Sequence, residues 1–69
     1  MTSDEAKRCL YSRKEVECNG ITYERITAII YRLDEAGKNI IVSAELLDKK
    51  RNSVTIAQLK DVKEKEIDK

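Results

Sequence analysis

The sequence predicts a mainly β protein: a strongly bent antiparallel meander, or a small barrel, of four to five strands with a short N-terminal α-helix. Two long apolar runs, residues 25–33 and 39–48, are rich in β-branched residues and contain no proline. The connection between them holds Asp34 and Gly37, residue types that hairpin turns use for left-handed backbone angles. The two runs therefore predict one long antiparallel hairpin at the centre of the fold.

The N-terminal segment predicts a helix over residues 3–12. Thr2 is followed three residues later by Glu5, which is the capping-box pattern, and acidic residues fill the first turn. Ala6, Cys9 and Leu10 recur at helical spacing and share one face. Because so short a helix is unstable alone, we expect this face to dock on the sheet.

Shorter strands are expected on either side of the central hairpin. The dipeptide Asn19-Gly20 accepts the positive backbone angles of a tight turn, so residues 15–18 and 21–24 predict a small hairpin, with a bend or bulge near residues 24–25.

Apolar and polar residues alternate over residues 53–57, which predicts a further strand. The spacing of Leu59 and Val62 suits one helical turn before a last strand at 62–63, and equally the start of a C-terminal helix. We expect a charged tail at 63–69 to fray, and the whole chain, 1–69, to form one domain.

The central hairpin carries apolar residues on both faces. A flat four-stranded sheet would leave two edges and one apolar face open, so closure into a small barrel is favoured. Strict two-residue alternation gives an excess apolar face that is a candidate interface: Ile29, Tyr31, Leu33, Ile41 and Leu47. The helix, a curled barrel wall or another protein could cover this face, or these five residues could themselves be the core. A homodimer or larger homo-oligomer, or a separate protein partner, is the functional interpretation.

Composition limits the range of functions. With no Phe and no Trp in 69 residues, the core must be aliphatic. The net charge of +1 comes from 14 basic and 13 acidic residues, a balance that favours neither nucleic acid nor a membrane surface. No apolar run approaches the ~18 residues of a membrane span, so we expect a cytoplasmic location. Cys9 and Cys18 are expected to stay reduced, and without histidine neither a metal site nor a cofactor is expected.

The most concentrated charge lies in the turn at residues 49–51. A basic turn can contact phosphates, and it can equally be a solvated tip that blocks strand pairing. With two arginines from the central hairpin, the candidate phosphate contacts are Lys49, Lys50, Arg51, Arg25 and Arg32. The alternative function is therefore nucleic-acid or nucleotide binding, including sequestration of a signalling nucleotide by an oligomer.

Catalysis is not expected. No Ser or Cys has a His to activate it, no glycine-rich loop exists to hold phosphate, and most carboxylates have Lys or Arg neighbours that suit solvated ion pairs. The sequence thus favours a non-enzymatic protein-binding module.

The order of elements from about residue 15 to 63 is similar to that of SH3-like and Sm-like small barrels, although the Sm uridine-binding signature is not evident. The segments 28–32, 42–48 and 52–56 also resemble small uncharacterised proteins of phages and mobile elements in Gram-positive bacteria. That resemblance implies an accessory cytoplasmic protein, for example a phage-encoded inhibitor of a host protein. It carries no catalytic residue over to this chain.

Overall fold

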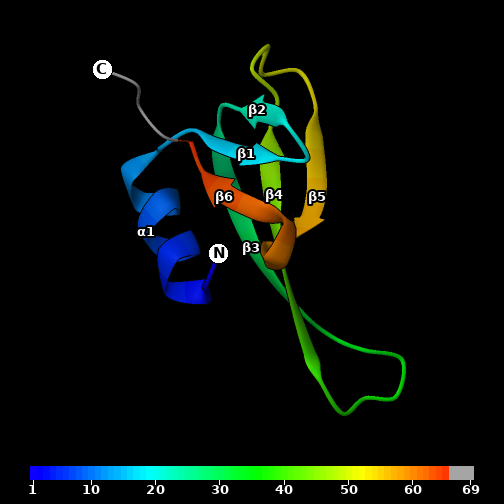
Figure 1. The fold of residues 1–69 in the computed structure, drawn as a ribbon. Coiled ribbons are helices and arrows are strands. Elements are labelled where there is room, and N and C mark those ends of the chain that lie inside the picture. Colours follow the sequence, from blue (N-terminus) through cyan, green and yellow to red (C-terminus); the bar gives the residue numbers. More distant parts are fainter. Residues whose placement is uncertain (66–69) are drawn as a thin grey trace.

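The computed structural model of this protein describes residues 1–65 and contains one helix and six strands (Figure 1). In chain order they are α1 (Ser3–Ser12), β1 (Val16–Cys18), β2 (Ile21–Tyr23), β3 (Arg25–Leu33), β4 (Ile40–Leu47), β5 (Val54–Gln58), the 3-10 turn η1 (Leu59–Asp61) and β6 (Val62–Glu64). The mainly β fold with a short N-terminal helix is thus confirmed. The single turn before a last strand is confirmed as well. Of the tail expected to fray, residues 63 and 64 belong to β6, and residues 66–69 lie outside the described part.

The capping box sets the start of α1. The Thr2 hydroxyl oxygen accepts the Glu5 N–H at 3.1 Å, and the Glu5 carboxylate accepts the Thr2 N–H at 2.8 Å. The bond from the Thr2 N–H to the Glu5 carboxylate is the main cause of a lowered pKa of Glu5. The helix ends at Arg13, whose φ of 59° is left-handed, and it buries Ala6 and Cys9 completely.

The strands form two three-stranded antiparallel sheets with the orders β2-β1-β6 and β3-β4-β5. Asn19 and Gly20, with φ of 52° and 80°, make the tight turn between β1 and β2. The chain bends at Glu24 from β2 into β3, and the Glu24 N–H donates to the Leu47 carbonyl at 2.8 Å. Within residues 1–65 no strand ladder joins the two sheets, so the expected closed barrel is not found.

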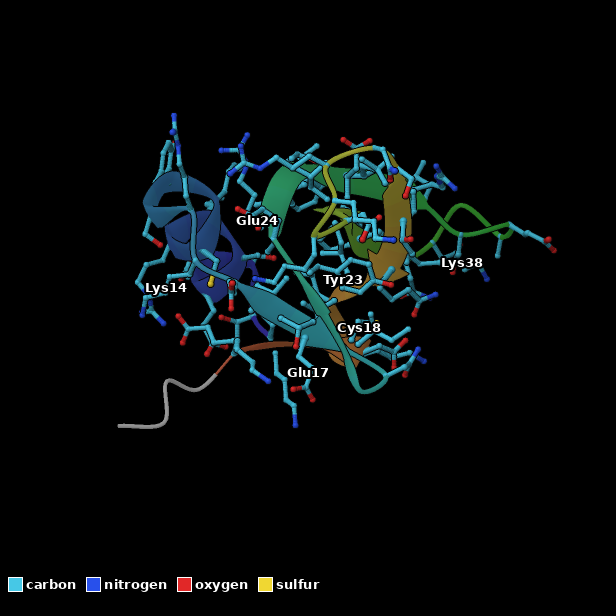
Figure 2. The ribbon with its side chains drawn as sticks, turned by 90° about the horizontal axis from the view of Figure 1, so that it is seen from above. Lys14, Glu17, Cys18, Tyr23, Glu24 and Lys38 are labelled. Atoms are coloured by element: carbon cyan, nitrogen blue, oxygen red, sulfur yellow. The ribbon has the colours of Figure 1, made fainter. Side chains whose placement is uncertain are left out.

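The core lies between the two sheets and under α1. Figure 2, seen from above, shows Cys18 and Tyr23 pointing toward the second sheet and Glu17 pointing away from it. The buried residues are small or aliphatic, as the composition requires: Ala6, Cys9, Val16, Cys18, Ile26, Ala44, Leu46, Leu59 and Val62.

A bulge in β3 decides which side chains reach this core. Ile26 pairs with Leu46 and Ala28 pairs with Glu45, so Thr27 is the extra residue at the shift. The Thr27 hydroxyl donates to the Glu45 carboxylate at 2.8 Å on the outer side of the sheet. The bulge therefore lies just beyond the bend expected at residues 24–25, and strict alternation fails across it.

The predicted grouping of five residues on one face is wrong for this reason. After the bulge, Ile29, Tyr31 and Leu33 share the inner face with Ile26, because they pair with Ala44, Val42 and Ile40. Ile41 and Leu47 lie one residue out of phase with those partners, on the outer face.

The one helix within residues 1–65 spans ten residues, and no helix there has the length and hydropathy needed to cross a membrane.

β6 is held to α1 by the carboxylate of Glu64. It accepts a hydrogen bond from the Cys9 Sγ at 3.4 Å and lies 3.5 Å from the Lys14 ammonium and 3.8 Å from the Arg8 guanidinium. The bond from Cys9, followed by the charge of Lys14, lowers the pKa of Glu64 below its ordinary value of 4.5. One hydrogen bond and one ion pair therefore link α1 to β6, and a second ion pair joins β6 to Lys14 just after the helix.

Stability should follow the protonation of Glu64. A carboxylate with a lowered folded-state pKa stabilises the fold above its unfolded-state pKa, and this contribution is lost as the pH falls through the folded-state value. We expect the difference in unfolding free energy between wild type and Glu64→Gln to shrink between pH 6 and pH 3. Urea unfolding across this range measures it, and a difference that does not change with pH would contradict the assignment.

Burial predicts a sharp contrast between two isoleucines. Ile26 is 1% exposed in the core and Ile21 is 56% exposed at the end of the β1–β2 hairpin. Ile26→Ala should lower the unfolding free energy by about 3 kcal/mol because it leaves a cavity, whereas Ile21→Ala should cost less than about 1 kcal/mol. Urea denaturation of both variants makes the comparison, and similar midpoints would place the core elsewhere.

Candidate functional site

β5 is an edge strand with an unpaired side. The Asp48 N–H donates to the Ser53 carbonyl at 3.0 Å, and bonded positions alternate along an antiparallel pair. The N–H and C=O groups of Val54, Ile56 and Gln58 therefore point away from β4. Among residues 1–65 no backbone group bonds to them across that edge. Val54 and Ile56 thus offer donors and acceptors to an added strand, whereas the Gln58 carbonyl is the N-cap acceptor of η1.

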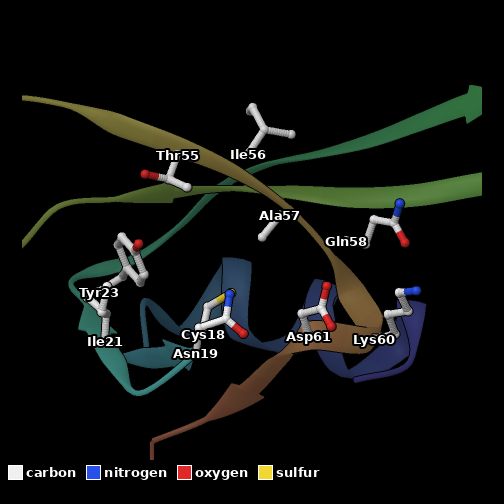
Figure 3. A pocket seen from close by; sticks show the side chains of 10 residues that line it. All are labelled: Cys18, Asn19, Ile21, Tyr23, Thr55, Ile56, Ala57, Gln58, Lys60 and Asp61. Atoms are coloured by element: carbon white, nitrogen blue, oxygen red, sulfur yellow. The ribbon is translucent and has the colours of Figure 1, made fainter.

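An open cleft of about 350 Å³ runs beside this edge (Figure 3). One wall is residues 55–58 of β5. The other wall comes from the β1–β2 hairpin, through Cys18, Ile21 and Tyr23. Lys60 and Asp61 of η1 close one end. The cleft therefore lies between the two sheets. In a closed barrel, strands from the two sheets would pair along this seam.

The opposite seam of the molecule is occupied by α1. The helix packs along β3, and its Cys9 thiol bonds to Glu64 of β6 (Figure 1). Side chains of α1 thereby fill the space between these two strands. The seam beside β5 has no such cover among the described residues.

The chemistry of the cleft suits binding. Burial raises the pKa of the Cys18 thiol, and the nearby Asp61 carboxylate adds to this rise, so the sulfur is a neutral thiol near pH 7. None of the side chains of β5 is charged. Nowhere in residues 1–65 do three or more Cys, Asp or Glu side chains gather in a way that could hold a metal ion.

The five candidate interface residues do not lie together on one surface. Ile29 packs against the core, whereas Tyr31 and Leu33 are 53% and 62% exposed farther along the hairpin. Ile41 and Leu47 belong to the outer face, which also carries Val54 and Ile56, each 50% exposed. α1 and the first sheet lie on the other side (Figure 1). The structure therefore separates the five residues into one that packs against the core, two exposed ones toward the hairpin tip and two on the outer sheet face.

The candidate phosphate contacts do not form one basic patch. Lys49 pairs with Glu15 and lies 3.8 Å from the Glu24 carboxylate, and the Arg51 guanidinium lies 3.0 Å from Glu24. Lys50 is exposed beside them.

The remaining two arginines of that set lie on β3. Arg25 begins the strand opposite Leu47, and Arg32 lies near its far end opposite Ile41. Carboxylates thus offset two of the three turn charges, and the arginines are spread along a strand.

The sequence did contain an overlooked signal for the cleft. Residues 52–59 are eight consecutive uncharged residues, the longest such run in a chain that is 39% charged. Natural edge strands are commonly protected by lysine, proline or a bulge, and β5 has none of these. Recognising β5 as an edge, however, required the sheet order.

Comparison with known proteins identifies no relative: no family model, no curated protein and no solved structure matches this chain.

The ion pairs of the basic turn predict weak affinity for polyanions. At about 0.15 M salt we expect wild type to pass through a heparin column without retention, because Glu15 and Glu24 offset Lys49 and Arg51. The Glu15→Gln/Glu24→Gln variant should be retained longer. Salt-sensitive retention of wild type that disappears in Lys49→Gln/Lys50→Gln/Arg51→Gln would contradict this and favour a phosphate-binding role.

Proposed function

We propose that this protein is a non-enzymatic binding module that takes up an extended segment of another protein along the free edge of β5. The unpaired N–H and C=O groups beside the cleft carry the proposal. An added strand would satisfy them through main-chain hydrogen bonds, which supply affinity with little dependence on the sequence of the segment.

The cleft limits what can bind. Its volume of about 350 Å³ is near the lower end of known ligand sites and accommodates only a few residues. Because side chains of a strand alternate, every second side chain of the bound segment would lie against Tyr23 and Ala57, which line the cleft. We infer that the preferred segment is uncharged, with apolar residues at alternate positions.

This mode of binding also accounts for the open architecture. A barrel of the SH3-like kind would require the seam beside β5 to close, and in this proposal the strand of the partner fills that seam. If the resemblance to phage and mobile-element proteins holds, the partner is a host protein in the cytoplasm, and masking one of its segments would inhibit it. The nucleotide-binding alternative has less support, because Glu15 and Glu24 pair with the basic turn.

A proline at residue 56 tests the proposal. The N–H of Ile56 points away from β4, so Ile56→Pro removes a free donor and leaves the β4–β5 ladder intact. Random dodecapeptides displayed on phage and selected on the immobilised wild-type protein provide the probes. We expect the enriched peptides to be uncharged and alternating, and to lose at least about 10-fold in affinity on Ile56→Pro. Fluorescence anisotropy with labelled peptides measures the loss.

Two controls make the result specific. Ile56→Val keeps the donor and the β-branched shape, so it should bind as wild type does. Thr55→Pro removes an N–H that bonds to β4, so it should lower the melting temperature, whereas Ile56→Pro should change it little. Enriched peptides that bind Ile56→Pro as tightly as wild type would refute strand addition at this edge.

A further inference from the structure

The far half of the central hairpin projects from the body of the molecule. We define the arm as residues 30–42, the part of β3 and β4 beyond the reach of β5, whose pairing with β4 begins at Ser43. In Figure 1 the arm extends well past η1, and in Figure 2 Lys38 marks its tip. An isolated two-stranded hairpin is marginally stable in water, so a partner would stabilise the arm.

One face of the arm is an apolar stripe. Leu33 pairs with Ile40 and Tyr31 pairs with Val42, so all four side chains lie on the same face. Three of them are largely exposed: Tyr31 at 53%, Leu33 at 62% and Ile40 at 63%. This face continues the inner face of the sheet, but the first sheet and η1 do not extend far enough to cover it.

The molecule has more surface than its mass requires. Its accessible area is 5161 Å², whereas a compact monomer of 7.9 kDa exposes about 4,400 Å². The difference, roughly 750 Å², is close to the ~800 Å² that each partner buries in a standard interface. The radius of gyration of 12.2 Å also exceeds the ~11 Å expected for this length. Pairing of two arms through their apolar stripes would bury part of this excess surface.

The charges of the arm allow a second copy as the partner. Arg32 and Lys38 contribute two positive charges and Asp34 and Glu35 two negative ones, so the arm has no net charge. Two identical arms therefore meet without net repulsion. The apolar stripe is uncharged and complements itself across a two-fold axis.

We propose that two copies of this chain form a dimer in which the apolar stripes of their arms, Tyr31, Leu33, Ile40 and Val42, pack against each other. The interface is isologous and uses the inner face of each arm. It is separate from the β5 edge, so strand binding and dimerisation are independent functions of the same fold.

Solution mass tests the dimer directly. Sedimentation velocity of wild type from about 1 to 500 μM should show a monomer–dimer equilibrium. Leu33→Lys/Ile40→Lys should raise the dissociation constant at least about 100-fold, because it buries like charges at the centre of the interface. Tyr11→Lys is the matched control, since Tyr11 is 84% exposed on α1, outside the arm, and this variant should dimerise as wild type does.

A charge-exchange experiment separates loss of the interface from loss of the fold. Leu33→Lys/Ile40→Lys and Leu33→Glu/Ile40→Glu should each be monomeric, with wild-type circular dichroism, and an equimolar mixture should form a heterodimer. Ile56→Pro should leave the dimer mass unchanged, so failure of the strand-binding proposal would not affect this result. Wild type that is monomeric up to 500 μM, or a dimer that survives both double substitutions, would overturn the proposal.

Discussion

The bulge at Thr27 determines how the rest of the chain can pack. Without an extra residue between Ile26 and Ala28, Ile29 would face outward and the central hairpin would bury a different set of side chains. With it, Ile26 and Ile29 lie on the same side, over Leu46 and Ala44, where the first sheet and α1 meet them. The hydrogen bond from Thr27 to Glu45 satisfies both side chains at the bulge. One inserted residue therefore defines both the core and the two surfaces that remain apolar.

Most of the fold could be predicted because its signals are local. The capping box of Thr2 and Glu5 fixed the start of the helix, and Asn19-Gly20 fixed the first hairpin, since each depends on residues within a few positions. The two apolar runs predicted the central hairpin. The position of the bulge was harder to predict, because Thr27 is an ordinary strand residue and becomes the extra one only through its pairing with β4.

The candidate sites were predicted less well, because a site depends on which strands become neighbours. The residues 49–51 looked like a basic patch until Glu15 and Glu24, far away in the sequence, proved to be their ion-pair partners. The exposure of Tyr31 and Leu33 also arises from length, because β3 and β4 continue past the first sheet and η1, which cover the inner face nearer the body. The alternation of side chains along one strand gives no information about where a neighbouring element ends. Sequence reasoning identified the apolar residues of the hairpin correctly and assigned their faces incorrectly.

The distribution of charge connects the cleft with the surface around it. Exposed ion pairs contribute little to stability, and those at Glu17, Glu24 and Glu64 lie on the outer sides of the sheets and at the seam with α1. A lysine within β5 would protect its edge, because an exposed strand edge is prone to unwanted pairing and a single charged side chain suppresses that pairing. The fold does not require Ile56 to be uncharged, because half of its side chain is in solvent. A neutral edge in so charged a chain is the feature that the proposed strand addition requires.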